Sequence, residues 1–354
     1  MPRASTRGTG GASASRRLAA LLLVAVAAAP FAAAAAAEQQ QQQRVGLSTQ
    51  TAAPGVITRE LPSIDSYASL STQQLRDSFL IEKVFAPNEI LLTYTTSTLD
   101  RLILGGAVPT RGRPLTLSLG NGTGAGAGGV GQAVLDRREL AVFNIGPGAA
   151  TVTLDGDQEF ELGAKDVLYV PFGTQEVVMA AAAAAAAGDE GGAAAAPPPR
   201  LFLASAPCRT AFPAAVATPA TAKTVKLGAA ETANARAWRQ MIAPGVGPSS
   251  CQLMVGVTEL APGSVLNTMP MHRHLRRSEA YLYFDLAPEQ RVFHMLGTPQ
   301  ETRHVVVADG QAALWPSWSV HAGAGTSSYS FVWVMAGENQ SFADMEVVPT
   351  ASLM

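Results

Sequence analysis

The stretch His272-Arg273-His274-Leu275-Arg276-Arg277-Ser278-Glu279-Ala280-Tyr281 holds the pattern that says most about the fold. His272 and His274 are two residues apart, so on a β-strand both side chains point to the same side. Glu279 can return to that side after a short turn, and His321 follows a strand-like segment further along the chain. This spacing predicts a metal site inside a β-barrel, with His272, His274, Glu279 and His321 as its ligands.

The predicted donor set also indicates which metal ion to expect. Three imidazoles and one carboxylate suit a borderline divalent ion, so one zinc ion per chain is favoured, with manganese, iron and nickel as alternatives. All five histidines of the 354-residue chain lie between His272 and His321, which supports a single site in the last third. A set of surface histidines beside arginines is the alternative interpretation; it would suit any one of these histidines better than it suits their joint spacing.

The segments around this stretch have the features of short β-strands. Strands are expected over residues 89–94, 139–145, 151–154, 167–170, 176–179, 252–260, 279–285, 292–295, 303–307, 312–315 and 328–335. Many short strands separated by turn residues predict an all-β sandwich or barrel. One short helix is expected near the start, because Ser71-Thr72-Gln73-Gln74 resembles a capping box and apolar residues follow at helical spacing.

The spacing of strands and turns is similar in the two halves, which favours two stacked β-barrels of the double-stranded β-helix type. We expect a first barrel over residues 67–227 and a second, metal-binding barrel over residues 228–354. Residues 180–199, rich in alanine, glycine and proline, are expected to be an insertion in a surface loop of the first barrel. The glycine-rich residues 120–131 are expected to be a loop that binds no phosphate, because no Lys-Ser/Thr pair follows them.

The N-terminal residues have the features of a targeting segment. Residues 1–37 contain no acidic residue and pass from an arginine-bearing start into a run of alanine, leucine and valine. This pattern predicts a removable leader, a secreted or organellar protein, and no stable membrane association once the leader is removed. A signal anchor, an untargeted tail and a cytoplasmic location are the alternatives. Residues 38–66 are expected to be a low-order linker.

Composition excludes several classes of protein. A formal net charge of −2 and a pI near 6.2 leave no excess of basic charge for nucleic-acid binding. Two cysteines, Cys208 and Cys251, are too few for a disulfide scaffold or a cysteine-rich zinc module. Because Cys251 opens a predicted core strand, a buried thiol is its expected state.

Other polar residues near the predicted site are further candidates. Arg276, Arg277 and Arg303 could recognise a carboxylate through a planar guanidinium group, with solvated surface arginines as the alternative. His304 could move a proton near the site or be structural, and His294 has no assigned role.

Long strings of residues resemble one enzyme family. They comprise residues 75–85, 100–101, 105–106, 137–140, 144–146, 166–170, 267–274, 293–295, 299–304, 316–319 and 336–340. In these strings the chain resembles the bacterial 4-deoxy-L-threo-5-hexosulose-uronate ketol-isomerases of pectin breakdown, also called 5-dehydro-4-deoxy-D-glucuronate isomerases. The resemblance implies a bicupin fold, a homo-hexamer, and one zinc ion in the second barrel. The resemblance also implies that the zinc ligands are His272, His274, Glu279 and His321, the same four residues that their spacing selected.

Some positions depart from the family pattern. The family usually has tryptophan at Leu266, Ala-His at Cys208-Arg209, and Thr, Glu and Met at Arg273, Leu275 and Ser278. The insertion at residues 180–199 is absent from typical members. None of these departures removes a predicted ligand, although several bear on the shape of the pocket.

The implied reaction converts 5-dehydro-4-deoxy-D-glucuronate, a small-molecule uronate, to 3-deoxy-D-glycero-2,5-hexodiulosonate through an enediolate. A metal ion with an open position would hold the enediolate charge, and a base would move the proton. Glu301 and His304 are the chosen candidates for the base, with Glu338 and Tyr283 also open, and Arg303 and Arg276 are candidates for binding the carboxylate. The alternatives are another metal-dependent cupin enzyme, either a deoxyglucuronate isomerase or an oxygenase, and a non-catalytic cupin that binds sugar acids.

Overall fold

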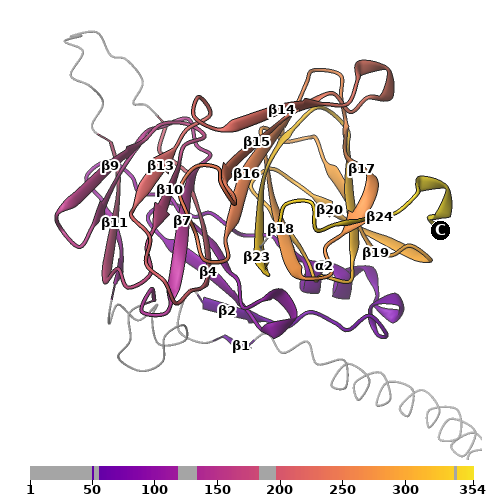
Figure 1. Cartoon of the computed structure of the whole chain (residues 1–354), viewed down its shortest axis with the longest axis horizontal. Coiled ribbons are helices and arrows are strands. Elements are labelled where there is room, and N and C mark those ends of the chain that lie inside the picture. The colour runs from indigo at the N-terminus through magenta and orange to yellow at the C-terminus, as the bar shows by residue number, and fades with distance from the viewer. Residues whose placement is uncertain (1–49, 52–55, 119–133, 183–196, 339–340) are drawn as a thin grey trace, which may run out of the picture. The chain divides into compact units, whose positions relative to one another are not determined.

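The structure is a computed structural model that describes residues 50–51, 56–118, 134–182, 197–338 and 341–354. These residues form two β-sandwiches that follow one another along the chain, mainly magenta and mainly orange in Figure 1. The predicted all-β class, with two double-stranded β-helix halves and a short helix, is confirmed, although each half, in its described residues, is a pair of packed sheets and not a closed barrel. Among the described residues, no helix is both long enough and apolar enough to cross a bilayer.

The first sandwich combines an eight-stranded and a four-stranded sheet. The larger sheet has the order β1 (Gln50–Thr51), β2 (Val56–Arg59), β4 (Ile90–Thr95), β5 (Ile103–Ala107), β12 (Leu201–Pro207), β7 (Arg138–Asn144), β10 (Val167–Val170), β13 (Ala215–Ala217). The smaller sheet has the order β6 (Leu115–Ser118), β11 (Glu176–Ala181), β8 (Ala150–Leu154), β9 (Gln158–Leu162). Buried residues alternate with half-buried ones along β8, so one face of this strand meets the core.

The second sandwich combines a seven-stranded and a five-stranded sheet. The larger sheet has the order β14 (Lys223–Leu227), β15 (Arg236–Ile242), β16 (Met254–Leu260), β23 (Ser330–Gly337), β18 (Arg277–Phe284), β21 (Ala312–Trp315), β3 (Leu80–Ile81). The smaller sheet has the order β20 (Glu301–Val307), β19 (Val292–Thr298), β22 (Val320–Gly325), β17 (Leu266–Arg273), β24 (Glu346–Val347). All eight residues of β18 are buried, which places this strand at the centre of the second half.

The predicted helix is present as α2 (Thr72–Phe79). Ser71 accepts a hydrogen bond from the backbone of Gln74, and the Gln74 side chain accepts one from the backbone of Ser71, which completes the capping box. Leu75 and Phe79 are buried. The chain continues directly into β3, which pairs with β21, so a segment from the start of the fold completes a sheet of the second half. Figure 1 shows α2 in indigo beneath the orange strands.

A buried carboxylate connects the two halves. Glu139 on β7 has no exposed surface and accepts hydrogen bonds from the backbone N–H groups of Cys251, Gln252 and Leu253 at 2.7, 2.7 and 2.8 Å. The hydroxyl of Tyr169 donates a fourth bond at 3.0 Å. These bonds hold the loop that leads into β16 against the first sandwich.

The expectation of a buried thiol at Cys251 is wrong, because Cys251 forms a disulfide with Cys208. Cys208 directly follows β12 of the first half, and Cys251 lies in the loop held by Glu139. Their Cα atoms are 5.6 Å apart, well within the range of a disulfide. The 43-residue separation gave no indication of this contact, which depends on how the two sandwiches meet.

Several expectations from the sequence differ from the structure or fall outside its described part. Part of the expected linker is strand β2, whose β-branched residues pair in parallel with β4. The first two residues of the expected insertion, 180 and 181, still belong to β11. The leader at residues 1–37, the glycine-rich residues 120–131 and most of the insertion lie outside the described residues.

Candidate metal centre

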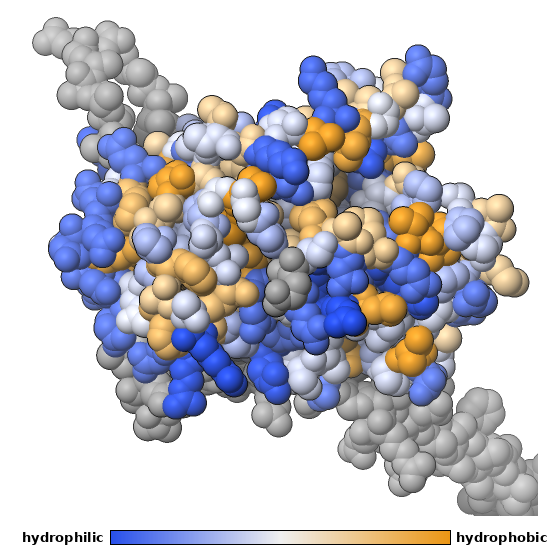
Figure 2. All heavy atoms as spheres, in the orientation of Figure 1, coloured by the Kyte–Doolittle hydropathy of each residue, from blue (hydrophilic) through white to orange (hydrophobic). Residues whose placement is uncertain are grey.

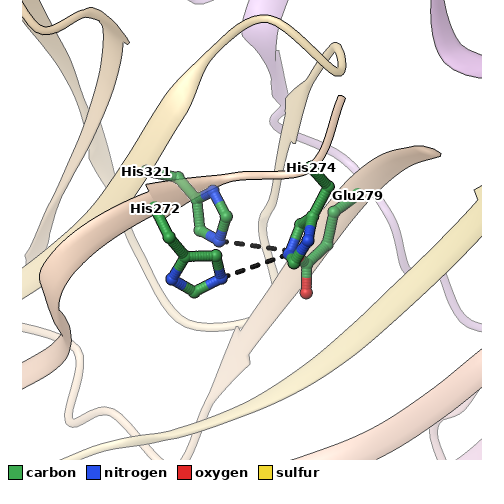
Figure 3. Close-up of side chains that lie close together, drawn as sticks. All are labelled: His272, His274, Glu279 and His321. Carbon is green, nitrogen blue, oxygen red and sulfur yellow. Dashed lines mark hydrogen bonds and ion pairs between the residues drawn. The ribbon is translucent and has the colours of Figure 1, made fainter. Parts of the chain in front are cut away.

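Three strands bring the four predicted ligands together. His272, near the end of β17, lies directly opposite His321 on the neighbouring β22. His274 follows one residue after β17, and Glu279 comes from β18 in the other sheet. The alternation of side chains along a strand explains why both histidines of the His-x-His pair reach the same interior space, as Figure 3 shows.

The distances within the cluster fit a bound cation. Nε2 of His272 lies 3.1 Å from Nε2 of His274, and Nε2 of His274 and of His321 each lie 3.2 Å from Oε2 of Glu279. One ligand atom from each residue lies within 4.8 Å of all the others. Metal–ligand bonds of about 2.0–2.1 Å put neighbouring ligand atoms about 3 Å apart. The four residues therefore form a candidate metal site.

Burial of the cluster supports the same conclusion. Glu279 and His274 are each 3% exposed and His321 is fully buried. Glu279 Oε2 and both ring nitrogens of His321 are buried without a hydrogen-bond partner among the described residues. Leaving such a group unpaired costs roughly 1–3 kcal/mol, and a metal ion would supply a partner for Glu279 Oε2 and for Nε2 of His321, the ring nitrogen that faces it.

The protonation of the cluster suits metal binding. Burial lowers the pKa of His272 to about 2, and the charges of His321 and His274 act in the same direction. Burial alone would raise the pKa of Glu279, but the adjacent His274 and His321 outweigh it and the net shift is downward. Neutral imidazoles and an ionised carboxylate are the forms that coordinate a metal.

A buried arginine, Arg277, holds the backbone segment that lies beside the Nδ1 atom of His274. Arg277 is 1% exposed and donates hydrogen bonds to the carbonyl oxygens of Ser341, Phe342 and Asp344 at 2.7, 3.1 and 3.1 Å. The same Asp344 carbonyl lies 3.2 Å from Nδ1 of His274. Nη2 of Arg277 lies 3.3 Å from the same Nδ1, so Nδ1 is held by this arginine and the carbonyl that it anchors, and Nε2 faces the cluster.

An Arg277→Met variant is expected to bind the metal about 10–100-fold more weakly, because the segment carrying Asp344 loses its anchor and His274 loses its orientation. The measurement is a competition titration of the purified protein against a chelator. Arg291→Met is the matched control, since Arg291 lies in the same half and its guanidinium donates to the nearby carbonyls of Pro288 and Gln290. Equal metal affinity of the Arg277→Met variant and the wild type would contradict this role.

The cluster opens into a cavity of about 340 Å³. One wall is aromatic: Trp238 meets Phe342 with ring centroids 4.7 Å apart and lies 6.0 Å from Trp333. Besides the predicted ligands, the titratable side chains of the described lining are Arg236 and Tyr281. Burial raises the pKa of Tyr281 well above its ordinary value, so its hydroxyl keeps its proton. A cavity of this size suits a small polar molecule held between a metal, one cation and an aromatic wall.

The structure does not bring the other predicted site residues to this cavity. Glu301, Arg303 and His304 lie on β20, at the edge of the five-stranded sheet. Arg303 donates to the backbone carbonyls of Ala68 and Leu70 at 2.8 and 2.9 Å, and His304 is exposed, its ring 5.8 Å from that of Phe293. Their proposed roles as base and carboxylate binder have no support from this placement.

Three other candidates also lie away from the cavity. Arg276 is exposed and pairs with Glu338 at 2.8 Å. The hydroxyl of Tyr283 bonds to Nδ1 of His294 at 2.7 Å, and the His294 ring stacks on Trp315 with centroids 4.6 Å apart. Burial lowers the pKa of His294 to about 3, so it is a neutral core residue.

Two residues of the cavity, Tyr281 and Arg236, were missed from the sequence. Tyr281 lies two residues after Glu279 on β18, so the same alternation that selected the histidine pair could have selected it. Arg236 lies on β15, which joins the site only through the order of strands in the sheet. No local pattern in the sequence marks that position.

The fold and the cluster together define a class of protein. Two successive β-sandwiches, the second enclosing three histidines and a glutamate, fit a bicupin with a candidate metal site in its second domain. The chain belongs to the KduI/IolB family, whose model matches residues 123–349.

Relatives with established names agree with this assignment. The chain is 46% identical over 289 residues to a 4-deoxy-L-threo-5-hexosulose-uronate ketol-isomerase of Cereibacter sphaeroides, covering 81% of this chain and 95% of that protein. A protein of the same name from Formosa agariphila is 43% identical, covering 84% and 98% of the two chains. These relatives confirm the predicted family and the predicted enzyme class, an isomerase that acts as an intramolecular oxidoreductase.

A solved structure shares the fold. An IolB-like protein from Salmonella typhimurium LT2 superimposes with a TM-score of 0.58 at 16% identity, covering 77% of this chain and 97% of that one. At this level of identity the likeness concerns the fold, and it agrees with the predicted pair of cupin domains.

Proposed function

We propose that this protein is a ketol-isomerase that converts 5-dehydro-4-deoxy-D-glucuronate to 3-deoxy-D-glycero-2,5-hexodiulosonate in the breakdown of pectin and related polyuronates. The proposal rests mainly on one observation: Arg236 and the residues of the metal cluster line the same cavity. The substrate has a carbonyl group to be polarised and a carboxylate to be held, and these two features match the two charged parts of the cavity.

Zinc is the ion that we propose for the cluster, at one per chain. His272, His274, Glu279 and His321 would hold it, because imidazole nitrogens and carboxylate oxygens are donors that zinc binds. When bound, the ion would supply Lewis-acid stabilisation of the negative charge that develops on the enediolate oxygen.

The chain's own residues would position the substrate. The Arg236 guanidinium matches a carboxylate in shape and charge, and it is the only arginine of the described cavity lining. The protonated hydroxyl of Tyr281 can donate a hydrogen bond to a substrate oxygen. The wall of Trp238, Trp333 and Phe342 excludes water from one side of the cavity, which strengthens both interactions.

The direct test is an NMR assay of the purified full-length protein, loaded with zinc, on the unsaturated galacturonate breakdown product. The expected result is loss of the 5-dehydro-4-deoxy-D-glucuronate signals and appearance of the product signals. No conversion by the wild-type protein would refute the proposal. Iron or manganese in the purified protein together with oxygen uptake would instead identify another metal-dependent cupin enzyme.

An Arg236→Gln variant is expected to raise KM about 10–100-fold with a smaller change in kcat, because a charged hydrogen bond to the substrate carboxylate is lost in both the ground and transition states. Steady-state kinetics with the NMR assay give both constants. Arg239→Gln is the control: Arg239 lies on the same strand but pairs with Glu259 at 2.8 Å and does not line the cavity. An unchanged KM for Arg236→Gln would remove Arg236 from substrate binding.

We also propose that the protein works outside the reducing cytosol, in a secreted or organellar location. The acid-free leader at residues 1–37 supports this location. The disulfide between Cys208 and Cys251 supports it further, because such bonds persist mainly in oxidising compartments. Assembly as a homo-hexamer stays a prediction of the family resemblance.

A further inference from the structure

We propose that the cleft between the two sandwiches is a second binding site, separate from the metal cavity, that takes an acidic oligosaccharide with a carboxylate on each sugar ring. The cleft is the larger cavity, at about 1130 Å³, and no residue that lines it also lines the metal cavity. Its walls come from both halves of the chain, with the disulfide between Cys208 and Cys251 in the wall where they meet.

The charge of the cleft is the main observation. Four arginines line it: Arg101, Arg137, Arg209 and Arg276. Of these, Arg276 pairs with Glu338, whereas within the described part of the chain the guanidinium groups of the other three form no hydrogen bond or ion pair. Figure 2 shows strongly hydrophilic side chains in the lower middle of the drawn face, near the ends of β18 and β23.

The acidic residues of the cleft do not balance this charge. Asp100 accepts a hydrogen bond from the backbone of Ser278 at 2.9 Å, and Glu338 is occupied by Arg276. The four arginines of the lining therefore outnumber its two carboxylates, Asp100 and Glu338, and the concave surface carries an excess of positive charge. A concave surface of one charge sign concentrates ligands of the opposite sign, so the ligand class is an anion.

The arrangement of the cations indicates an extended anion with several separate charges. Arg101 precedes β5, Arg137 precedes β7 and Arg209 follows β12, so each arginine comes from a different connection. The volume is about three times that of the metal cavity, which we assign to a single hexuronate. An oligouronate has one carboxylate per ring, spaced along its length, and so provides a separate partner for each guanidinium group.

The remaining lining suits sugar rings. Phe172 and Phe212 offer apolar faces, and Thr210 and Ser250 offer hydroxyl groups. A sugar ring has apolar C–H faces and hydroxyl edges, which match these two kinds of side chain. A compact polyphosphate has neither apolar faces nor widely spaced charges, so it matches the cleft less well.

The test is isothermal titration calorimetry of the full-length protein with trigalacturonic acid at low salt. Binding is expected, and it is expected to weaken as salt is raised because it depends on charge. Maltotriose, a neutral trisaccharide, is expected not to bind. Binding of tripolyphosphate without binding of trigalacturonic acid would overturn the proposal, and so would the absence of any binding by trigalacturonic acid.

Two pairs of variants locate the site. Arg137→Gln with Arg209→Gln is expected to weaken trigalacturonic acid binding at least about tenfold, the effect of losing one charge-assisted hydrogen bond or more. These side chains make no hydrogen bond within the described chain, so the fold is expected to be retained. Arg111→Gln with Arg113→Gln removes the same charge from an exposed turn outside the cleft and serves as the control.

One further variant separates the cleft from the metal cavity. Arg236→Gln is expected to leave the affinity for trigalacturonic acid unchanged, because Arg236 does not line the cleft. If Arg236→Gln abolished binding while the cleft variants did not, the oligosaccharide would lie in the metal cavity and the second site would be refuted. This outcome does not depend on whether the protein isomerises the hexuronate.

Discussion

A His321→Ala variant is expected to lose its metal ion and its isomerase activity together. His321 is fully buried, its Nε2 lies 3.2 Å from Glu279 Oε2, and its ring centroid is 4.5 Å from that of His272. Removing it deletes one of four converging ligands and leaves a void in which water cannot restore the geometry. Losing a preorganised group that stabilises developing charge costs about 10²–10³-fold in rate, so the activity is expected to fall at least that far.

The measurement combines metal content by mass spectrometry, turnover in the NMR assay and circular dichroism of the same preparation. Glu279→Gln is the companion variant, because it keeps the shape of the side chain and removes the negative charge that faces two imidazoles. Both variants are expected to retain the β-sheet spectrum of the wild type. A folded His321→Ala protein that kept full metal content and full activity would show that the cluster is not the catalytic centre.

A Glu139→Gln variant is expected to lower the free energy of unfolding by about 2–4 kcal/mol. The Glu139 carboxylate is fully buried and accepts three backbone N–H groups and the Tyr169 hydroxyl. Glutamine offers one acceptor oxygen where the carboxylate offers two, and its amide N–H₂ would face a backbone donor. At least one buried donor is then left without a partner.

The free energy of unfolding is measured by urea titration, with the midpoint temperature as a second readout. For a chain of this size, the stated loss corresponds to a fall of about 3–5 °C. Glu159→Gln is the control, since Glu159 is exposed on β9 and is expected to change stability by no more than about 0.5 kcal/mol. Equal stability of the Glu139 variant and the wild type would mean that the loop before β16 is held by the disulfide alone.

The residues that the sequence predicted well are those whose geometry is local. The His-x-His pair and Glu279 lie on or beside two consecutive strands, so alternation along a strand is enough to place them together. His321 was identified by its distance along the chain, and it lies opposite His272 in the register of β17 and β22. The capping box at Ser71 was predicted for the same reason, since all its contacts fall within four residues.

The residues that the sequence did not predict depend on how distant strands meet. Arg236 reaches the cavity from β15, and Cys208 meets Cys251 only because the two sandwiches pack at that point. Glu301 and His304 have suitable chemistry and lie near the ligands in sequence, yet β20 is an edge strand beyond β19 and β22. Chemistry and sequence proximity select candidates, but sheet order decides which of them face the metal.

The pairing of β3 with β21 also sets a condition on synthesis of the chain. Leu80 and Ile81 find their partners at Ala313 and Ala312, and the ribosome makes these residues more than 200 positions later. At about 5–20 residues per second, the nascent segment waits on the order of 10–50 s with the apolar side chains of α2 and β3 uncovered. The second sandwich therefore cannot be completed as an isolated C-terminal fragment, and a chaperone has a defined window in which to protect this segment.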